Sequence, residues 1–93
     1  MRALSLAFLL AVAASPAAAA CYADYKAQRT GPLRLHYGVV ALDGDACASA
    51  QAAAQAVAAR LGDGWQLLQL VGIFGEDGLE QRRDSAGDFF LRY

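Results

Sequence analysis

The fold is decided by residues 46–70, which read ACASAQAAAQAVAARLGDGWQLLQL. Alanine, the strongest helix former, dominates the first two thirds of this stretch and predicts a helix from Ala46 to Leu61. Asp45 is suited to cap its start, and Gly62 stands where a left-handed residue is expected to end it. Apolar residues spaced three and four apart define the stripe that this helix is expected to bury: Cys47, Ala50, Ala54, Val57 and Leu61. After the helix the pattern changes to the two-residue period of a strand.

A strand is predicted on each side of this helix. The segment Leu33–Leu42 alternates with period two, and its apolar residues fall mainly on one face. The segment Trp65–Phe74 is apolar on both faces, which predicts that both are covered. A strand–helix–strand unit crosses over right-handed, and this makes its two strands parallel. Small alanine side chains allow the helix to lie close against these strands.

Three further segments complete the predicted order. Residues 22–29 are predicted to form two helical turns, which Thr30-Gly31-Pro32 ends. Residues 79–86 are polar and predict a short helix or an irregular connection. Phe89–Tyr93 is predicted as a last, antiparallel strand, either beside the second strand or between the other two. The sequence therefore predicts an α+β fold: a small three-stranded mixed sheet with one alanine-rich helix on one face (strand-helix-strand-strand), plus a short N-terminal helical segment.

The first twenty residues have the pattern of a secretory signal peptide. A positive charge at Arg2 precedes twelve uncharged, mostly apolar residues, and Ser15-Pro16 and four alanines follow them. A membrane-spanning helix needs about 20 apolar residues, so this run is too short to span a bilayer. We expect cleavage after Ala20, which leaves a single small domain over residues 21–93. The predicted location is secreted, in the bacterial periplasm.

Cleavage after Ala20 makes Cys21 the first residue, and two outcomes are open for it. Cys21 can form a disulfide with Cys47, the only other cysteine, and closing that loop is worth about 3.5 kcal/mol in the chain-entropy model. Alternatively, small residues before a cysteine resemble a bacterial lipobox, which would make Cys21 a lipid anchor. The usual lipobox has a larger aliphatic residue where this chain has Ala18, and lipidation would leave an unpaired thiol in an oxidising compartment. The disulfide is favoured.

The junction Leu61-Gly62-Asp63-Gly64-Trp65-Gln66-Leu67-Leu68 resembles a family of small bacterial domains of unknown function. In that family an alanine- or leucine-rich helix ends in Leu-Gly, and Gly-Trp-Glu-Leu and a strand follow. The resemblance covers about residues 33–93, and Gln66 stands here in place of the usual glutamate. From Cys21-Tyr22-Ala23-Asp24 onward the chain also looks like uncharacterised secreted proteins of proteobacteria. Both resemblances imply the fold and the compartment but no activity.

The residue types that usually carry catalysis are sparse in this sequence. His36 is the only histidine; it lies mid-strand beside Arg34, where a surface or packing role is commoner than general-base catalysis or metal binding. Two cysteines and one histidine cannot complete a structural zinc site without carboxylates. The glycines mark turns and form no phosphate-binding loop. We therefore predict no catalytic residue, no cofactor and no metal ligand.

Charge argues against nucleic acid as a partner. The chain has 8 Lys and Arg against 9 Asp and Glu, a net charge of −1. The one basic pair, Arg82-Arg83, is flanked by Glu80 and Asp84. A phosphate-binding surface needs a clear excess of positive charge, so nucleic-acid binding is not expected.

The sheet face opposite the alanine-rich helix suggests a function. It is expected to expose Leu68, Leu70, Phe74 and one of Phe89 or Phe90, and apolar patches of that size usually mark contacts. Either the 22–29 segment folds across this face, or a protein partner or a second copy covers it. The expected function is thus a small, exported, non-enzymatic module that binds a protein or forms a homodimer. The alternatives are a small-molecule binder or weak hydrolase using His36 with Tyr37 or a carboxylate, and a lipid-anchored envelope protein.

Overall fold

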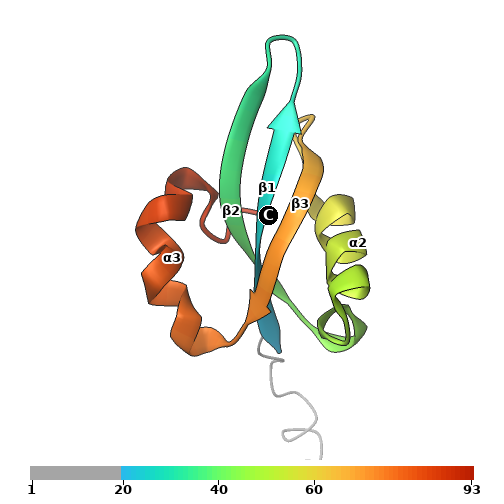
Figure 1. The fold of residues 1–93 in the computed structure, drawn as a ribbon, viewed down its shortest axis with the longest axis vertical. Coiled ribbons are helices and arrows are strands. Elements are labelled where there is room, and N and C mark those ends of the chain that lie inside the picture. Colours follow the sequence, from blue (N-terminus) through green and yellow to red (C-terminus); the bar gives the residue numbers. More distant parts are fainter. Residues whose placement is uncertain (1–19) are drawn as a thin grey trace, which may run out of the picture.

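A three-stranded sheet lies between two helices in the computed structural model, which describes residues 20–93 (Figure 1). In chain order the elements are β1 (Cys21–Arg29), β2 (Arg34–Leu42), the 3₁₀ turn η1 (Gly44–Cys47), α2 (Ala50–Arg60), β3 (Gln66–Phe74), the 3₁₀ turn η2 (Glu76–Gly78), α3 (Leu79–Ala86) and the 3₁₀ turn η3 (Gly87–Phe89). The predicted α+β class is confirmed. The predicted signal peptide, Ala20 apart, lies outside the described residues.

The segment predicted as an N-terminal helix is instead the central strand of the sheet, β1. It pairs with β2 on one side and with β3 on the other, giving the order β2-β1-β3. Alanine, lysine, glutamine and arginine favour a helix locally, which explains the wrong prediction. The same residues also alternate, because Ala23, Tyr25 and Ala27 are buried on one face while Lys26 is exposed on the other. Pairing with two strands therefore overrides the local preference.

The strands on either side of α2 run parallel, as predicted, but they are not neighbours. Both β2 and β3 are antiparallel to β1, which lies between them. The sheet is therefore antiparallel throughout, and the prediction of a mixed sheet was wrong. The central strand is therefore β1, which precedes both of the strands that it pairs with in the sequence.

The predicted last strand does not form. Residues 89–93 contribute a single bridge between Phe90 and Val39, at the outer edge of β2, where the Leu91 amide donates to the Val39 carbonyl at 2.8 Å. Leu91 has a left-handed backbone, with φ 57, which is incompatible with a continued strand. The segment passes around this edge of the sheet, and Arg60 of α2 donates to the main-chain oxygen of Tyr93.

Helix α2 begins later than predicted because another residue caps it. The Ser49 hydroxyl accepts a hydrogen bond from the Ala52 amide at 3.0 Å, so Ser49 and not Asp45 is the N-cap. The residues before it form η1 instead of a first helical turn. On the buried stripe Val57 is correct, but Ala53 is the alanine that is fully buried and Ala50 is exposed.

The hydrophobic core lies between the sheet and α2. Its buried members come from all parts of the fold: Cys21, Ala23, Tyr25, Ala27, Val40, Leu42, Ala53, Val57 and Trp65. The opposite face is covered by α3, which was neither of the two coverings considered from the sequence, residues 22–29 or a partner. Figure 1 shows the two helices on opposite sides of the sheet. There Arg82 of α3 lies over the ring of Phe74, 3.9 Å from its centroid. One of the aromatic residues expected to be exposed is thus covered.

Candidate functional site

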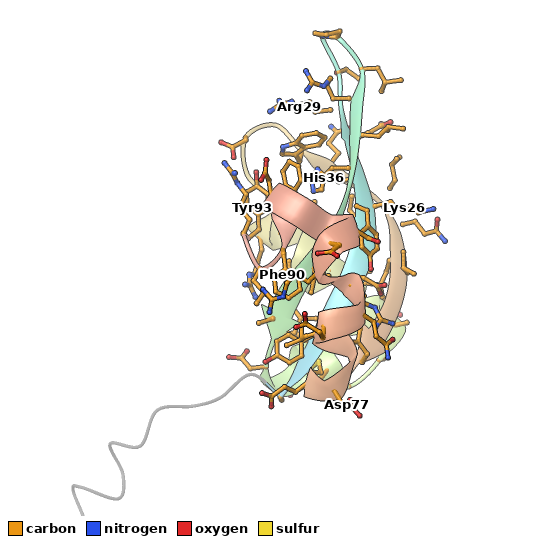
Figure 2. The ribbon with its side chains drawn as sticks, turned by 90° about the vertical axis from the view of Figure 1, so that its left-hand side faces the viewer. Lys26, Arg29, His36, Asp77, Phe90 and Tyr93 are labelled. Carbon is orange, nitrogen blue, oxygen red and sulfur yellow. A yellow bond between two sulfur atoms is a disulfide. The ribbon has the colours of Figure 1, made fainter. Side chains whose placement is uncertain are left out.

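His36, the one candidate for catalysis, lies in an aromatic cluster on the α2 face of the sheet. Its ring stacks on Phe89 at a centroid distance of 3.6 Å and meets Trp65 edge-on at 4.2 Å. Its Nε2 atom shares a hydrogen bond of 2.9 Å with the Tyr25 hydroxyl, while Nδ1 is buried without a partner. Figure 2 shows His36 at a height between Arg29 and Phe90 along the long axis of the molecule. The imidazole is therefore packed on several sides.

The electrostatics of this cluster keep His36 neutral. Burial, together with the positive charges of Arg29 and Arg92, lowers the pKa of His36 from 6.5 to about 4. Burial also raises the pKa of the Tyr25 phenol to about 12. No pocket is found within residues 20–93. The neutral imidazole packs among the aromatic rings of the cluster.

The structure separates His36 from Tyr37, its proposed partner. Neighbouring residues of a strand point to opposite faces, and the Tyr37 hydroxyl donates to Asp24 on the α3 face at 2.8 Å. Burial and this hydrogen bond raise the pKa of Tyr37 to about 12. The two side chains therefore cannot act on the same substrate.

The predicted disulfide between Cys21 and Cys47 is present. Their Cα atoms lie 6.0 Å apart, and 26 positions separate them in sequence. The bond ties the start of the central strand to the turn before α2. Because it uses both sulfur atoms, neither is a thiol for catalysis, and the sulfur of Cys21 is not free for a lipid thioether.

A buried ionic group on the α3 face was missed by the sequence reasoning. Asp24 is buried, and one of its oxygens accepts hydrogen bonds from Tyr37 and from Arg82, the latter at 3.1 Å. Arg82 also donates to the Gly78 carbonyl at 2.7 Å. The available signal was an aspartate inside an alternating strand, since a buried aspartate needs a partner. The sequence did not identify this partner, because Arg82 is 58 residues away. This group fastens α3 to the sheet.

Strand β3 lies at an edge of the sheet and has no buried residue, so the prediction that both of its faces are covered was wrong. Its nine residues, QLLQLVGIF, include no charged side chain. Leu68, Val71 and Ile73 remain 51%, 48% and 37% exposed. Two register shifts against β1 lie opposite this region, leaving Leu68 and Val71 as extra residues between paired positions. Of the residues predicted to form an apolar contact surface, Leu68 is exposed, whereas Leu70 packs half-buried against the core.

Comparisons with known proteins add no functional information. The sequence matches no family model, and neither a curated protein nor a solved structure matches it. Within residues 20–93 no three histidine, cysteine or acidic side chains gather as they would around a metal ion. No helix in that part of the chain is long and apolar enough to cross a membrane.

Proposed function

We propose that this protein is a small, exported, non-enzymatic module that binds a protein partner, or a second copy of itself, through β3. The observation that carries the proposal is the uncharged edge strand with Leu68, Val71 and Ile73 exposed along it. Edge strands normally carry proline, or lysine and other charged side chains, which prevent association. An apolar edge without such protection is typical of a contact surface.

The binding mode follows from the irregular register of β3. Two extra residues against β1 bend the strand and interrupt its regular spacing. A bulged edge is a poor template for a long ladder of main-chain hydrogen bonds. The module therefore binds mainly through the projecting apolar side chains, with main-chain pairing limited to short segments.

Two observations support export. The disulfide between Cys21 and Cys47 forms and persists in oxidising compartments. The sequence before it has the order of a secretory signal peptide, with cleavage expected after Ala20. A periplasmic or extracellular location accounts for both.

The alternative that uses His36 as a base has less support. Phe89, Trp65 and Tyr25 pack against the half-buried ring, and its low pKa favours the neutral form. The β3 surface, in contrast, is open to solvent. We therefore place the function at the edge of the sheet.

Site-specific photo-crosslinking in the expressing cell tests the proposal. A photoreactive amino acid at position 68 or 71 is expected to give discrete crosslinked products. The matched control is position 51, because Gln51 is exposed on α2, away from β3. Products of the same size and yield from position 51, or no product from either β3 position in properly folded protein, would contradict the proposal. A product of twice the monomer mass identifies a homodimer.

A further inference from the structure

The distal half of the β1–β2 hairpin, residues 26–36, is a second exposed surface with a different chemistry. We call it the arm. Arg29 pairs with Arg34 at its outer end, and the turn between them is the tip. In Figure 1 the tip extends beyond both helices, so solvent surrounds it. No part of the core depends on the side chains of the tip.

All the formal charges on the arm are positive. Lys26, Arg29 and Arg34 lie within it, and the sequence has no acidic residue between Asp24 and Asp43. Lys26 and Arg34 form no ion pair with any residue of the described chain. This local excess of positive charge contrasts with the net charge of −1 for the whole sequence.

The arrangement of these charges weakens the hairpin itself. Arg29 and Arg34 lie directly opposite each other in the register, and like charges at such positions destabilise a strand pair. Arg29 relieves part of this repulsion by lying over the Trp65 ring and donating to the Asp63 carbonyl. Arg34 has no such partner. Such local destabilisation of the hairpin is expected where binding of a negatively charged ligand offsets the repulsion.

Two leucines accompany these charges, Leu33 in the tip and Leu35 next to it in β2. Leu33 is 62% exposed and Leu35 is 66% exposed, which makes them the most exposed large apolar residues of the described chain. Arginine and lysine next to exposed aliphatic side chains are typical of surfaces that bind anionic membranes: the cations contact headgroups while the apolar groups enter the acyl boundary. Nucleic-acid surfaces use aromatic stacking with their cations, and the arm exposes no aromatic side chain at its tip.

We propose that the arm is a contact for an anionic lipid surface, with Leu33 and Leu35 inserted and with Lys26, Arg29 and Arg34 against the headgroups. The fold orients the molecule for this contact. Four exposed acidic residues lie at the opposite end of the sheet, near the start of β1: Asp43, Asp45, Glu76 and Asp77. Figure 2 shows Asp77 and Arg29 toward opposite ends of the molecule. An anionic surface therefore attracts the tip and repels the other end.

Co-sedimentation with vesicles tests this inference. The disulfide-bonded protein is expected to bind phosphatidylcholine vesicles that contain phosphatidylglycerol, and to bind pure phosphatidylcholine vesicles much less. Replacing Arg34 by glutamine is expected to lower the partition coefficient about fivefold, and added salt is expected to weaken binding. The matched control is Arg83→Gln on α3, which removes an exposed arginine outside the arm.

The leucines require their own comparison. Leu35→Asp is expected to lower the partition coefficient at least tenfold, whereas Leu68→Asp, at an exposed leucine of β3, leaves it unchanged. Because Leu35 lies outside the core, far-UV circular dichroism of the variant is expected to match the wild type.

Three outcomes would overturn the inference: no binding to the anionic vesicles, equal losses in the Leu35 and Leu68 variants, or binding to single-stranded DNA that needs the arginines but not the leucines. The inference concerns a surface separate from β3. Its failure is therefore distinguishable from failure of the photo-crosslinking experiment.

Discussion

Acidification below neutral pH is expected to destabilise the protein through His36. In the folded state the pKa of His36 is lowered to about 4, whereas the pKa of an unperturbed histidine in an unfolded chain is 6.5. Between these values the unfolded chain binds the proton and the folded protein does not. Stability from this source is therefore complete above about pH 6.5, falls as the pH decreases, and stops falling below about pH 4.

The magnitude follows from the two pKa values. Linkage over this window gives a loss of about 2 kcal/mol at pH 5 relative to neutral pH. The side chain of His36 is only half-buried, and solvent screening reduces the expected loss to about 1 kcal/mol. The charged groups near the ring are Arg29, Arg92 and, joined to Tyr93 by a hydrogen bond, Asp63.

Urea unfolding at a series of pH values measures this loss. Trp65 is the only tryptophan and lies against the imidazole, so its fluorescence reports the cluster directly. Between pH 6.5 and 5 the free energy of unfolding is expected to fall in the wild type and to stay nearly level in His36→Gln, since His36 is the only histidine. An equal slope in the variant would show that other groups cause the acid sensitivity and would refute the reasoning.

Three further predictions concern stability and are tested by chemical unfolding. Gly38→Ala is expected to destabilise the protein by about 1–3 kcal/mol, because a methyl group there overlaps the phenol of Tyr25. Gly72→Ala makes only an ordinary contact and serves as the control. Equal losses of stability in the two variants would contradict the overlap. Arg82→Ala leaves Asp24 buried without its ion pair and is expected to cost about 3 kcal/mol, while Arg83→Ala removes an exposed pair and changes stability by less than about 0.5 kcal/mol. Reducing the disulfide is expected to cost about 3.5 kcal/mol, and an unchanged urea midpoint would show that the bond contributes nothing.

The parts of the fold that the sequence predicted correctly depend on local patterns. The alternation of β2, the mixed apolar faces of β3 and the alanine-rich composition of α2 each identify an element from neighbouring residues alone. The disulfide could also be predicted, because the chain has only two cysteines. These features need no knowledge of what packs against them.

The parts that were missed depend on residues far apart in sequence. Residues 22–29 have the composition of a helix, and only pairing with two later segments makes them a strand. Phe89 and Phe90 favour a strand by type, yet Phe89 fills the space over His36 instead. The contact between Asp24 and Arg82 spans most of the fold. In each case the decisive energy comes from tertiary packing.

The position of the exposed apolar residues was predicted only in part. Apolar residues on the face opposite α2 were expected to be covered by residues 22–29 or by a partner, but α3 covers much of this face. The large apolar residues that stay exposed lie on β3, on the arm and at Leu91. A polar segment such as residues 79–86 gives little sign that it will cover a sheet. Arg82 makes this possible, because its aliphatic stem and its planar head pack over Phe74 while its charge pairs with Asp24.

The central position of β1 determines how the protein withstands a mechanical pull. Tension applied at residue 20 runs along a strand that is hydrogen-bonded on both sides, so the two ladders are loaded in shear and many bonds must break together. The link from Cys21 to η1 passes part of the force to a second point. A pull on Tyr93 first meets its hydrogen bonds with Arg60 and Asp63 and then the single bridge between Phe90 and Val39, which can break one after another because none belongs to a ladder. The molecule is therefore strongly anchored at its amino-terminal end and easily unravelled from the other.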